Sequence, residues 1–211
     1  MFFETILFDL DDTLYPASSG LWTVLQSRIE LFMTERMHLA PDQVPALREE
    51  LFRKHGTTLR GLSELYHIDE QEFLDFVHNV PLADYIQPNP RLKAVLSQMP
   101  QRKIIFTNAD SNHATRVINV LELQGCFEQI IDVRDIHPYC KPQNEAFLKA
   151  LELAAIPQPQ KCLMIDDAPR NLIAAKALGI STVLIGNHPS PEPFDHYINC
   201  IDQIGNVLQE S

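Results

Sequence analysis

Three aspartates, Asp9, Asp11 and Asp12, follow an apolar run near the start of the chain, in the segment I-L-F-D-L-D-D-T-L-Y-P. Carboxylates this close repel one another, and burying an unpaired carboxylate is unfavourable. A hard divalent cation such as Mg²⁺ relieves that repulsion, because it prefers carboxylate oxygens as ligands. The residue types and their spacing therefore indicate metal-dependent chemistry at the end of this run.

Further polar side chains follow three later apolar runs of the sequence. Ligands bind beyond the carboxyl ends of the strands of a parallel sheet, so side chains at these ends meet at one edge. The candidates are Thr107 and Asn108 after the second run, Lys141 in Y-C-K-P after the third, and Asp166 and Asp167 after the fourth. The predicted site thus combines carboxylates, a hydroxyl, an amide and an amine.

This combination of groups suits phosphoryl transfer. A carboxylate beside a metal ion can attack phosphorus to give an aspartyl-phosphate, and a second carboxyl two residues on can protonate the leaving oxygen and then deprotonate water. The metal and Lys141 would stabilise the charge on the transferring group, while Thr107 and Asn108 offer hydrogen bonds to its oxygens. The acids expected to hold Mg²⁺ are Asp9, Asp11, Asp166 and Asp167.

Five apolar runs of the sequence are typical of buried strands. They are nearly unbroken rather than alternating, which indicates a parallel sheet covered on both faces. The predicted strands are Thr5–Asp9, Lys103–Thr107, Gln129–Val133, Lys161–Asp166 and Thr182–Ile185. The predicted helices around them are Arg91–Gln98, Ser111–Leu123, Asn144–Ala155, Pro169–Leu178 and a terminal helix within 198–208. Strands that alternate with helices in this way predict a doubly wound α/β fold.

The segment between the first two predicted strands is far longer than one crossover helix requires. Apolar residues recur there at helical spacing, as in Leu21, Leu25, Ile29 and Phe32, which predicts about four inserted helices. The Q-P-N-P stretch at 87–90 is typical of a return hinge. We therefore predict a core of residues 1–15 and 89–211 and a helical cap of residues 16–88.

The motifs D-L-D-D-T-L, F-T-N, K-P and I-D-D-A-P-R-N, in this order, resemble the haloacid dehalogenase-like (HAD) hydrolase superfamily. The resemblance implies that Asp9 is the nucleophile and that Asp11 is the acid/base and offers its backbone carbonyl to Mg²⁺. It also implies that the predicted insertion is a type 1 cap. The remaining implied site residues are Thr107 in the second motif, Lys141 in the third, and Asp166 and Asp167 as the acidic metal site in the fourth.

One position departs from the common fourth motif of this superfamily. Asn171 stands where a further acid is usual, four residues after Asp167. Asp167 is expected to dominate the metal site by the motif match, and Asn171 leaves Asp166 as the second acid.

Four longer stretches are similar to the pyrimidine 5'-nucleotidase-like branch of the superfamily, and the similarity extends to about residue 187. They are D-D-T-L-Y-P, H-G-T-T-L-R-G-L at 55–62, F-T-N-A-D-S-N-H-A at 106–114, and M-I-D-D-A-P-R-N. This resemblance implies a Mg²⁺-dependent phosphomonoester hydrolase that acts on nucleoside 5'-monophosphates, with pyrimidine nucleotides favoured. Another small phosphometabolite, such as a sugar phosphate or phosphoglycolate, is the alternative substrate.

Three other activities are alternatives. A haloacid dehalogenase is disfavoured, because Asp11 and the metal acids suit phosphorus chemistry better than displacement at carbon. A phosphomutase would have to keep water from the phosphoaspartate. A phosphoaspartate signalling module also combines acids, a threonine and a lysine, but it carries its acid pair and its phosphorylated aspartate on different strands. Here both lie in one D-x-D, which favours turnover.

Several residues outside the four core motifs have less specific assignments. Arg60 lies in G-T-T-L-R-G, which we interpret as a cap loop aimed at the leaving group, with a surface arginine as the alternative. His113 and Tyr15 are further candidates for substrate contact, and Asp12 is expected to face away and shape the turn. Thr107, Asn108, Asp166 and Asp167 could instead cap helices. Structural roles are expected for His55, Trp22, Phe73 and Phe76.

Composition limits the class of protein and its partners. Hydrophobic residues make up 45% and charged residues 21% of the chain, as is typical of soluble globular proteins. A net charge of -11 argues against nucleic-acid and anionic-membrane partners, which are bound by clustered Lys and Arg. The longest apolar runs fall well short of the roughly 18 residues of a membrane span. We expect a small phosphomonoester as partner, and a monomer or homodimer.

The first residues of the chain and the spacing of its cysteines indicate the cellular compartment. The opening M-F-F-E-T-I-L-F has no basic region typical of a signal peptide, so a cytoplasmic protein is expected. The four cysteines are widely scattered, which predicts reduced core residues rather than disulfides or a zinc site.

Overall fold

The computed structural model describes residues 3–186 and 193–210, which form an α/β fold around a parallel sheet. The strand order is β3-β2-β1-β4-β5-β6. The strands are β1 (Thr5–Phe8), β2 (Arg102–Phe106), β3 (Gln129–Ile131), β4 (Cys162–Asp166), β5 (Ser181–Ile185) and β6 (His196–Ile198). The predicted doubly wound α/β architecture is confirmed.

The order of the strands reverses at β1, which lies between β2 and β4. The chain runs outward from β1 through β2 to β3, then crosses to β4 on the other side. Phe8, the last residue of β1, pairs with Ile105 of β2 and with Ile165 of β4. The three strands therefore end at nearly the same height, and the residues that follow them share the crevice at which α/β sheets bind ligands.

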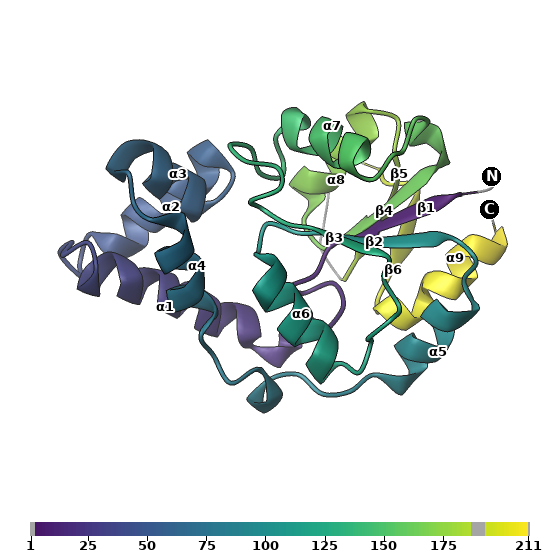
Figure 1. Ribbon diagram of the computed structural model, residues 1–211, viewed down its shortest axis with the longest axis horizontal. Helices are drawn as coiled ribbons and strands as arrows, with labels where there is room; N and C mark the ends of the chain where they lie inside the picture. The colour runs from purple at the N-terminus through teal and green to yellow at the C-terminus, as the bar shows by residue number, and fades with distance from the viewer. Residues whose placement is uncertain (1–2, 187–192, 211) are drawn as a thin grey trace.

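Both faces of the sheet are buried, which explains why the strands read as unbroken apolar runs. Ile6 and Phe8 of β1 belong to one core cluster, whereas Leu7 between them belongs to the other. Figure 1 shows α7 and α8 over one face and α5, α6 and α9 over the opposite face. These helices are α5 (Pro90–Gln98), α6 (Ser111–Val120), α7 (Asn144–Leu153), α8 (Pro169–Ala177) and α9 (Ile204–Glu210).

Four helices lie between β1 and α5 and form the predicted insertion, at the end of the molecule opposite the chain termini (Figure 1). They are α1 (Leu21–Glu35), α2 (Val44–His55), α3 (Thr58–Tyr66) and α4 (Glu70–His78). Phe32 of α1 meets Phe73 of α4 edge-on, with ring centroids 5.1 Å apart. A Cβ atom at Gly61 of α3 would lie 2.8 Å from Leu51 of α2, so glycine permits this close helix contact. The domain boundaries at residues 16 and 88 stay a prediction.

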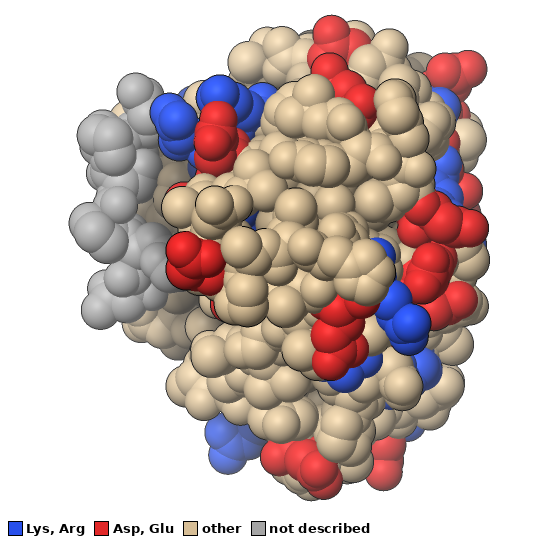
Figure 2. Space-filling model, turned by 90° about the vertical axis from the view of Figure 1, so that its left-hand side faces the viewer, with Lys and Arg blue, Asp and Glu red and all other residues tan. Residues whose placement is uncertain are grey.

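The outer face of the insertion carries both signs of charge. Figure 2 shows acidic and basic side chains mainly around the edge of this face and residues of other types at its centre. No helix within residues 3–186 and 193–210 is long and apolar enough to cross a membrane.

Two details of the predicted elements and one of the cysteine assignments need correction. The edge strand β6 was not predicted, because His196–Ile198 has only three residues, of which His196 is half-buried and Tyr197 is exposed. The helix expected over Ser111–Leu123 ends at Val120, and the chain turns at Glu122, where φ is 58°. Cys126, Cys140 and Cys162 are buried and reduced as expected, but Cys200 is exposed, so its assignment to the core is wrong.

Candidate active site

Asp9 begins the candidate site directly beyond β1. Its N–H continues the ladder between β1 and β4, donating to the carbonyl of Ile165 at 2.9 Å. The chain then turns at once: the N–H of Leu14 bonds the carbonyl of Leu10 at 2.9 Å, and Asp12 adopts φ 58°. The sheet thus fixes the Asp9 backbone, and the turn brings the next aspartates back over the end of the sheet.

Lys141 connects the strand ends through its ammonium group. Its Nζ donates to Asp9 Oδ1 at 2.6 Å, to Asp166 Oδ2 at 2.9 Å and to the carbonyl of Phe106 at 2.8 Å. The residue is only 1% exposed. Burial lowers the pKa of Lys141, but the two carboxylates outweigh burial and raise this pKa above its ordinary value. A permanently charged lysine therefore lies between two acids from different strands.

Thr107 and Asn108 follow β2 and hold the neighbouring backbone. The Asn108 amide donates to the carbonyl of Lys141 at 3.0 Å and accepts from its N–H at 2.9 Å. Thr107 Oγ1 accepts from the N–H of Ala109 at 3.0 Å. Neither residue caps α6, because Asp110 is its N-cap and accepts from His113 N–H. Asn108 therefore fixes the segment that carries the lysine.

A cluster of three carboxylates lies beside Lys141. One ligand oxygen from each of Asp9, Asp166 and Asp167 lies within 4.8 Å of the others. Asp166 is held by Asn171 Nδ2, at 3.0 Å from each oxygen, and by the N–H of Ala168 at 2.9 Å. Asn171 stands where the superfamily motif usually has a further acid. It does not supply a carboxylate to the site, but its amide holds the carboxylate of Asp166.

The carboxylates of this cluster repel one another. Burial raises the pKa of Asp9 well above its ordinary value against the opposing charge of Lys141, and Asp166 and Asp167 add to the rise. Burial, and next the charge of Asp166, raise the pKa of Asp167 to about 7. A divalent cation would remove both effects, since it offsets the charge of the acids and is coordinated by their oxygens. The donor set therefore fits Mg²⁺.

The Asp11 carboxyl is held apart from this cluster. Its Oδ1 accepts from the hydroxyl of Tyr15 at 2.5 Å and from Nε2 of His113 at 2.8 Å. Burial raises the pKa of Asp11, but His113 and the Tyr15 hydrogen bond outweigh burial and lower it below the ordinary value. Tyr15 and His113, expected as candidates for substrate contact, thus both bond to Asp11.

A cavity of about 230 Å³ joins these groups to the four-helix insertion. Its core side includes Asp9, Asp11, Asp12, Thr107, Lys141 and Asp167. Its insertion side is mostly apolar and includes Trp22, Leu25, Phe52, Phe73, Leu74 and Val77. The expectation that Asp12 faces away is therefore wrong, and burial, then Asp11, raise the pKa of Asp12 to about 6. Trp22 and Phe73 also line the cavity in addition to packing in the core.

A sequence model of the haloacid dehalogenase-like hydrolases matches residues 3–179, which include every acid of the site just described. The chain belongs to this family. The match extends over β1 to α8 and the insertion, so it covers the residues that form the candidate site.

Similar proteins support this assignment to the HAD hydrolases. Phosphate metabolism protein 8 of Saccharomyces cerevisiae is 25% identical over 197 residues, which are 86% of this chain and 61% of the yeast protein. This HAD hydrolase thus spans less than two thirds of the yeast relative. Phosphoglycolate phosphatase of Aquifex aeolicus is 25% identical over 189 residues, covering 86% of this chain and 84% of that one.

A solved structure has the same fold. The HAD-hydrolase YfnB from Bacillus subtilis, described as bound to magnesium, superimposes with a TM-score of 0.67 over 99% of both chains at 18% identity. The likeness extends over the sheet and the inserted helices, and it shows that the arrangement belongs to the HAD fold.

Among the cavity residues of this HAD hydrolase that were not predicted, three have basic or imidazole side chains. Arg170 lies in the D-D-A-P-R-N motif, stacks on Phe52 at 3.8 Å from the ring centroid, and donates to the Gly56 carbonyl at 2.9 Å. Arg48 lines the cavity from α2 and is paired with Glu30 at 3.0 Å. His78 lines it from the end of α4. Only Arg170 has a signal in the sequence, through its place in the motif.

Arg60 is a predicted site residue that the structure brings neither to the cavity nor to the cluster of carboxylates, whereas Asp166 belongs to that cluster without lining the cavity. The G-T-T-L-R-G stretch is not a loop: Arg60 lies in the first turn of α3, and its N–H bonds the N-cap Thr57 Oγ1 at 3.1 Å. Its guanidinium is bound to Glu70 at 2.8 Å, to the Tyr139 carbonyl at 3.2 Å and to the Val133 carbonyl. The side chain is 6% exposed, so the surface alternative is also wrong. Arg60 links the insertion to the segment after β3.

Arg60→Ala should therefore destabilise the protein rather than weaken substrate binding. Removing the guanidinium leaves two carbonyls without their donor and Glu70 without its arginine, at a cost of about 2–3 kcal/mol in the free energy of unfolding. Urea denaturation measures this loss, and KM should change by less than about 3-fold. Arg53→Ala on the exposed side of α2 is the matched control. A KM that rises 10-fold or more at unchanged stability would instead assign Arg60 to the substrate.

Proposed function

We propose that this hydrolase is a Mg²⁺-dependent phosphomonoesterase that acts through an aspartyl-phosphate on Asp9. The observation that carries the proposal is the contact of the Asp9 carboxylate with Lys141 beside Asp166 and Asp167. A second carboxyl, Asp11, lies two residues on and lines the same cavity. The names of relatives, one of them a phosphoglycolate phosphatase, support the reaction class.

The proposed reaction transfers the phosphoryl group twice. An oxygen of Asp9 attacks phosphorus as the bond from phosphorus to the leaving oxygen breaks, and Asp11 gives that oxygen a proton. Asp11 then takes a proton from water, which attacks the aspartyl-phosphate, releases phosphate and restores Asp9. In the free site the pKa of Asp11 is lowered, and a bound phosphate opposes this lowering because like charges disfavour ionisation.

The residues proposed to hold Mg²⁺ are Asp9, Asp167, Asp166 and the backbone carbonyl of Asp11. Asp166 already accepts from Lys141, Ala168 and Asn171, so Asp9 and Asp167 have more free coordination capacity. When bound, the ion supplies positive charge that stabilises the oxygens of the transferring group. Lys141 supplies the same sign of charge through its contacts with Asp9 and Asp166.

We propose nucleoside 5'-monophosphates as substrates, with pyrimidine nucleotides favoured. The insertion side of the cavity includes the aromatic residues Trp22, Phe52 and Phe73, a composition that suits a nucleobase. Thr57 and Thr58 also line this side, but their hydroxyls already bond the N–H of Arg60 and the carbonyl of Arg48. Phosphoglycolate stays the alternative: its carboxylate would have to bind Arg170, which lines the cavity without a carboxylate partner among the described residues, since Arg48 is already paired with Glu30.

A substrate panel with metal removal tests this proposal. We expect hydrolysis of uridine and cytidine 5'-monophosphates with kcat/KM at least about 10-fold above that of phosphoglycolate and glucose 6-phosphate. EDTA should abolish turnover of every substrate, and added Mg²⁺ should restore it. The reverse substrate order would overturn the nucleotide assignment but not the phosphatase. Full activity in EDTA, or hydrolysis of no phosphomonoester, would overturn the proposed function.

A further inference from the structure

The Asp11 carboxyl is held on one side only. Its hydrogen bonds from Tyr15 and from His113 both end on Oδ1. Within residues 3–186 and 193–210, no side chain or N–H bonds its Oδ2, and the side chain is 16% exposed toward the cavity. One oxygen is thus anchored, while the other remains available for proton exchange.

The imidazole of His113 is buried, and its side-chain hydrogen bond is the one to Asp11. The imidazole is 0% exposed, and the backbone N–H of His113, in the first turn of α6, donates to the N-cap Asp110 Oδ1 at 2.8 Å. Because an ionised Asp11 can only accept, Nε2 carries the ring proton in this contact. The other nitrogen, Nδ1, is buried without a partner among the described residues. Such an unpaired buried polar atom lowers the free energy of unfolding by about 1–3 kcal/mol. A contribution to stability therefore does not explain why a histidine is buried here.

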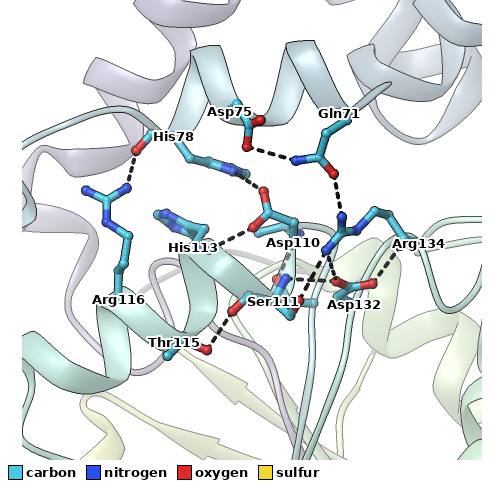
Figure 3. Close-up of polar contacts among 12 residues, drawn as sticks. Gln71, Asp75, His78, Asp110, Ser111, His113, Thr115, Arg116, Asp132 and Arg134 are labelled. Carbon is cyan, nitrogen blue, oxygen red and sulfur yellow. Dashed lines mark hydrogen bonds and ion pairs between the residues drawn. The ribbon is translucent and has the colours of Figure 1, made fainter. Parts of the chain in front are cut away.

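A residue of the insertion, His78, packs against the ring of His113. His78, the last residue of α4, stacks on it with ring centroids 4.2 Å apart and an interplanar angle of 19°. His78 Nδ1 also contacts Asp110 Oδ2 at 2.8 Å, and Arg116 of α6 donates to the His78 carbonyl at 2.6 Å. Figure 3 shows His78 and His113 side by side between α4 and α6, with Asp110 and Arg116 on either side.

A second contact ties α4 to the same end of α6. Arg134 donates to the side-chain oxygen of Gln71 in α4 at 2.5 Å, to Ser111 Oγ at 3.2 Å and to Asp132 at 3.4 Å (Figure 3). The stacked pair is therefore one part of a polar interface that connects the insertion with the first turn of α6.

We propose that His113 is a positioning residue that fixes Asp11 for proton transfer to the leaving oxygen, and that His78 makes this positioning depend on the seating of the insertion. The proposal rests on the proposed function, since it concerns the acid step of that reaction. Proton transfer requires the donor and acceptor oxygens within about 3 Å, and a carboxyl free to rotate loses that geometry. An insertion that moves away removes the stacked ring and releases His113.

The test compares leaving groups rather than overall activity. A dinitrophenolate leaves without a proton, whereas the ribose oxygen of a nucleotide needs one. The ratio kcat/KM reports the steps up to departure of the leaving group, so it isolates the acid step. His113→Leu should lower kcat/KM for uridine 5'-monophosphate about 100-fold and for dinitrophenyl phosphate by less than about 3-fold. His113→Gln, which keeps a donor near the place of Nε2, should recover part of the loss.

Two further variants keep the test decisive if His113→Leu does not fold. Tyr15→Phe removes only a hydroxyl, and His78→Leu removes the stacked ring. Both should lower kcat/KM for uridine 5'-monophosphate about 10-fold, with the same selectivity for the leaving group. Thr115→Val, on the exposed side of α6, should change neither substrate. Equal losses for both substrates would overturn the proposal and leave His113 a structural residue. A wild-type protein that hydrolyses neither ester would overturn the proposed function itself.

Discussion

Asp9→Asn is expected to lower kcat for phosphomonoester hydrolysis by at least about 10⁴-fold, because an amide cannot take the place of the attacking carboxylate. The fold should persist. The backbone N–H of Asp9 still bonds Ile165, and Lys141 keeps its contacts with Asp166 and the Phe106 carbonyl. Steady-state kinetics with a Mg²⁺-loaded sample measures the loss.

The pKa of Asp9 also predicts the direction in which Asp9→Asn changes the stability of the protein. Folding raises the pKa of Asp9, so the folded state binds more protons than the unfolded state, and stability falls as the pH rises through the raised pKa. At neutral pH without divalent cation, asparagine removes this unfavourable ionisation, and thermal unfolding should occur at the same or a higher temperature. Asp84→Asn at an exposed position is the control. Near-normal turnover by Asp9→Asn would refute the nucleophile assignment.

Lys141→Met is expected to affect stability and catalysis together. Methionine fills much of the volume but leaves Asp9 and Asp166 buried without their shared cation, which should cost about 3–5 kcal/mol in the free energy of unfolding. The loss of a positive charge beside the transferring group should lower kcat about 10³-fold. Urea denaturation and steady-state kinetics measure the two effects.

Mg²⁺ distinguishes this account of Lys141 from a simple packing defect. The ion offsets the charge of the same carboxylates, so it should stabilise Lys141→Met by more than it stabilises the wild type. Lys93→Met, at an exposed position of α5, should behave as wild type in both measurements. A stability loss that Mg²⁺ does not reduce would show that Lys141 acts mainly through packing.

The parts of the site that lie at strand ends could be predicted from the sequence, because buried parallel strands have a strong local pattern. Asp9 and Asp166 follow such runs directly, and the structure brings them to one lysine. Their roles in catalysis stay predictions. The inserted helices were predicted from apolar spacing in the same way, whereas β6 is too short to give a pattern.

The parts that could not be predicted depend on pairs that are distant in sequence. The stack of His78 on His113 joins α4 to α6, and no local pattern indicates that these rings meet. Arg60 was placed in a loop because of its flanking glycines, whereas Thr57 caps a helix there and the guanidinium finds Glu70 in the next helix. Asp12 was expected to face away, since the sequence does not show that its turn has a positive φ.

The insertion is one continuous segment of chain, and this affects how substrate preference could change between related proteins. One unbroken stretch of chain, from α1 to α4, supplies the apolar side of the cavity, while the proposed nucleophile, lysine and metal acids all lie outside it. Replacement of that stretch would therefore exchange recognition of the leaving group in a single genetic step and keep the phosphoryl chemistry. His78 limits this modularity, because a transplanted segment would need a ring at its last helical turn to preserve the stack on His113.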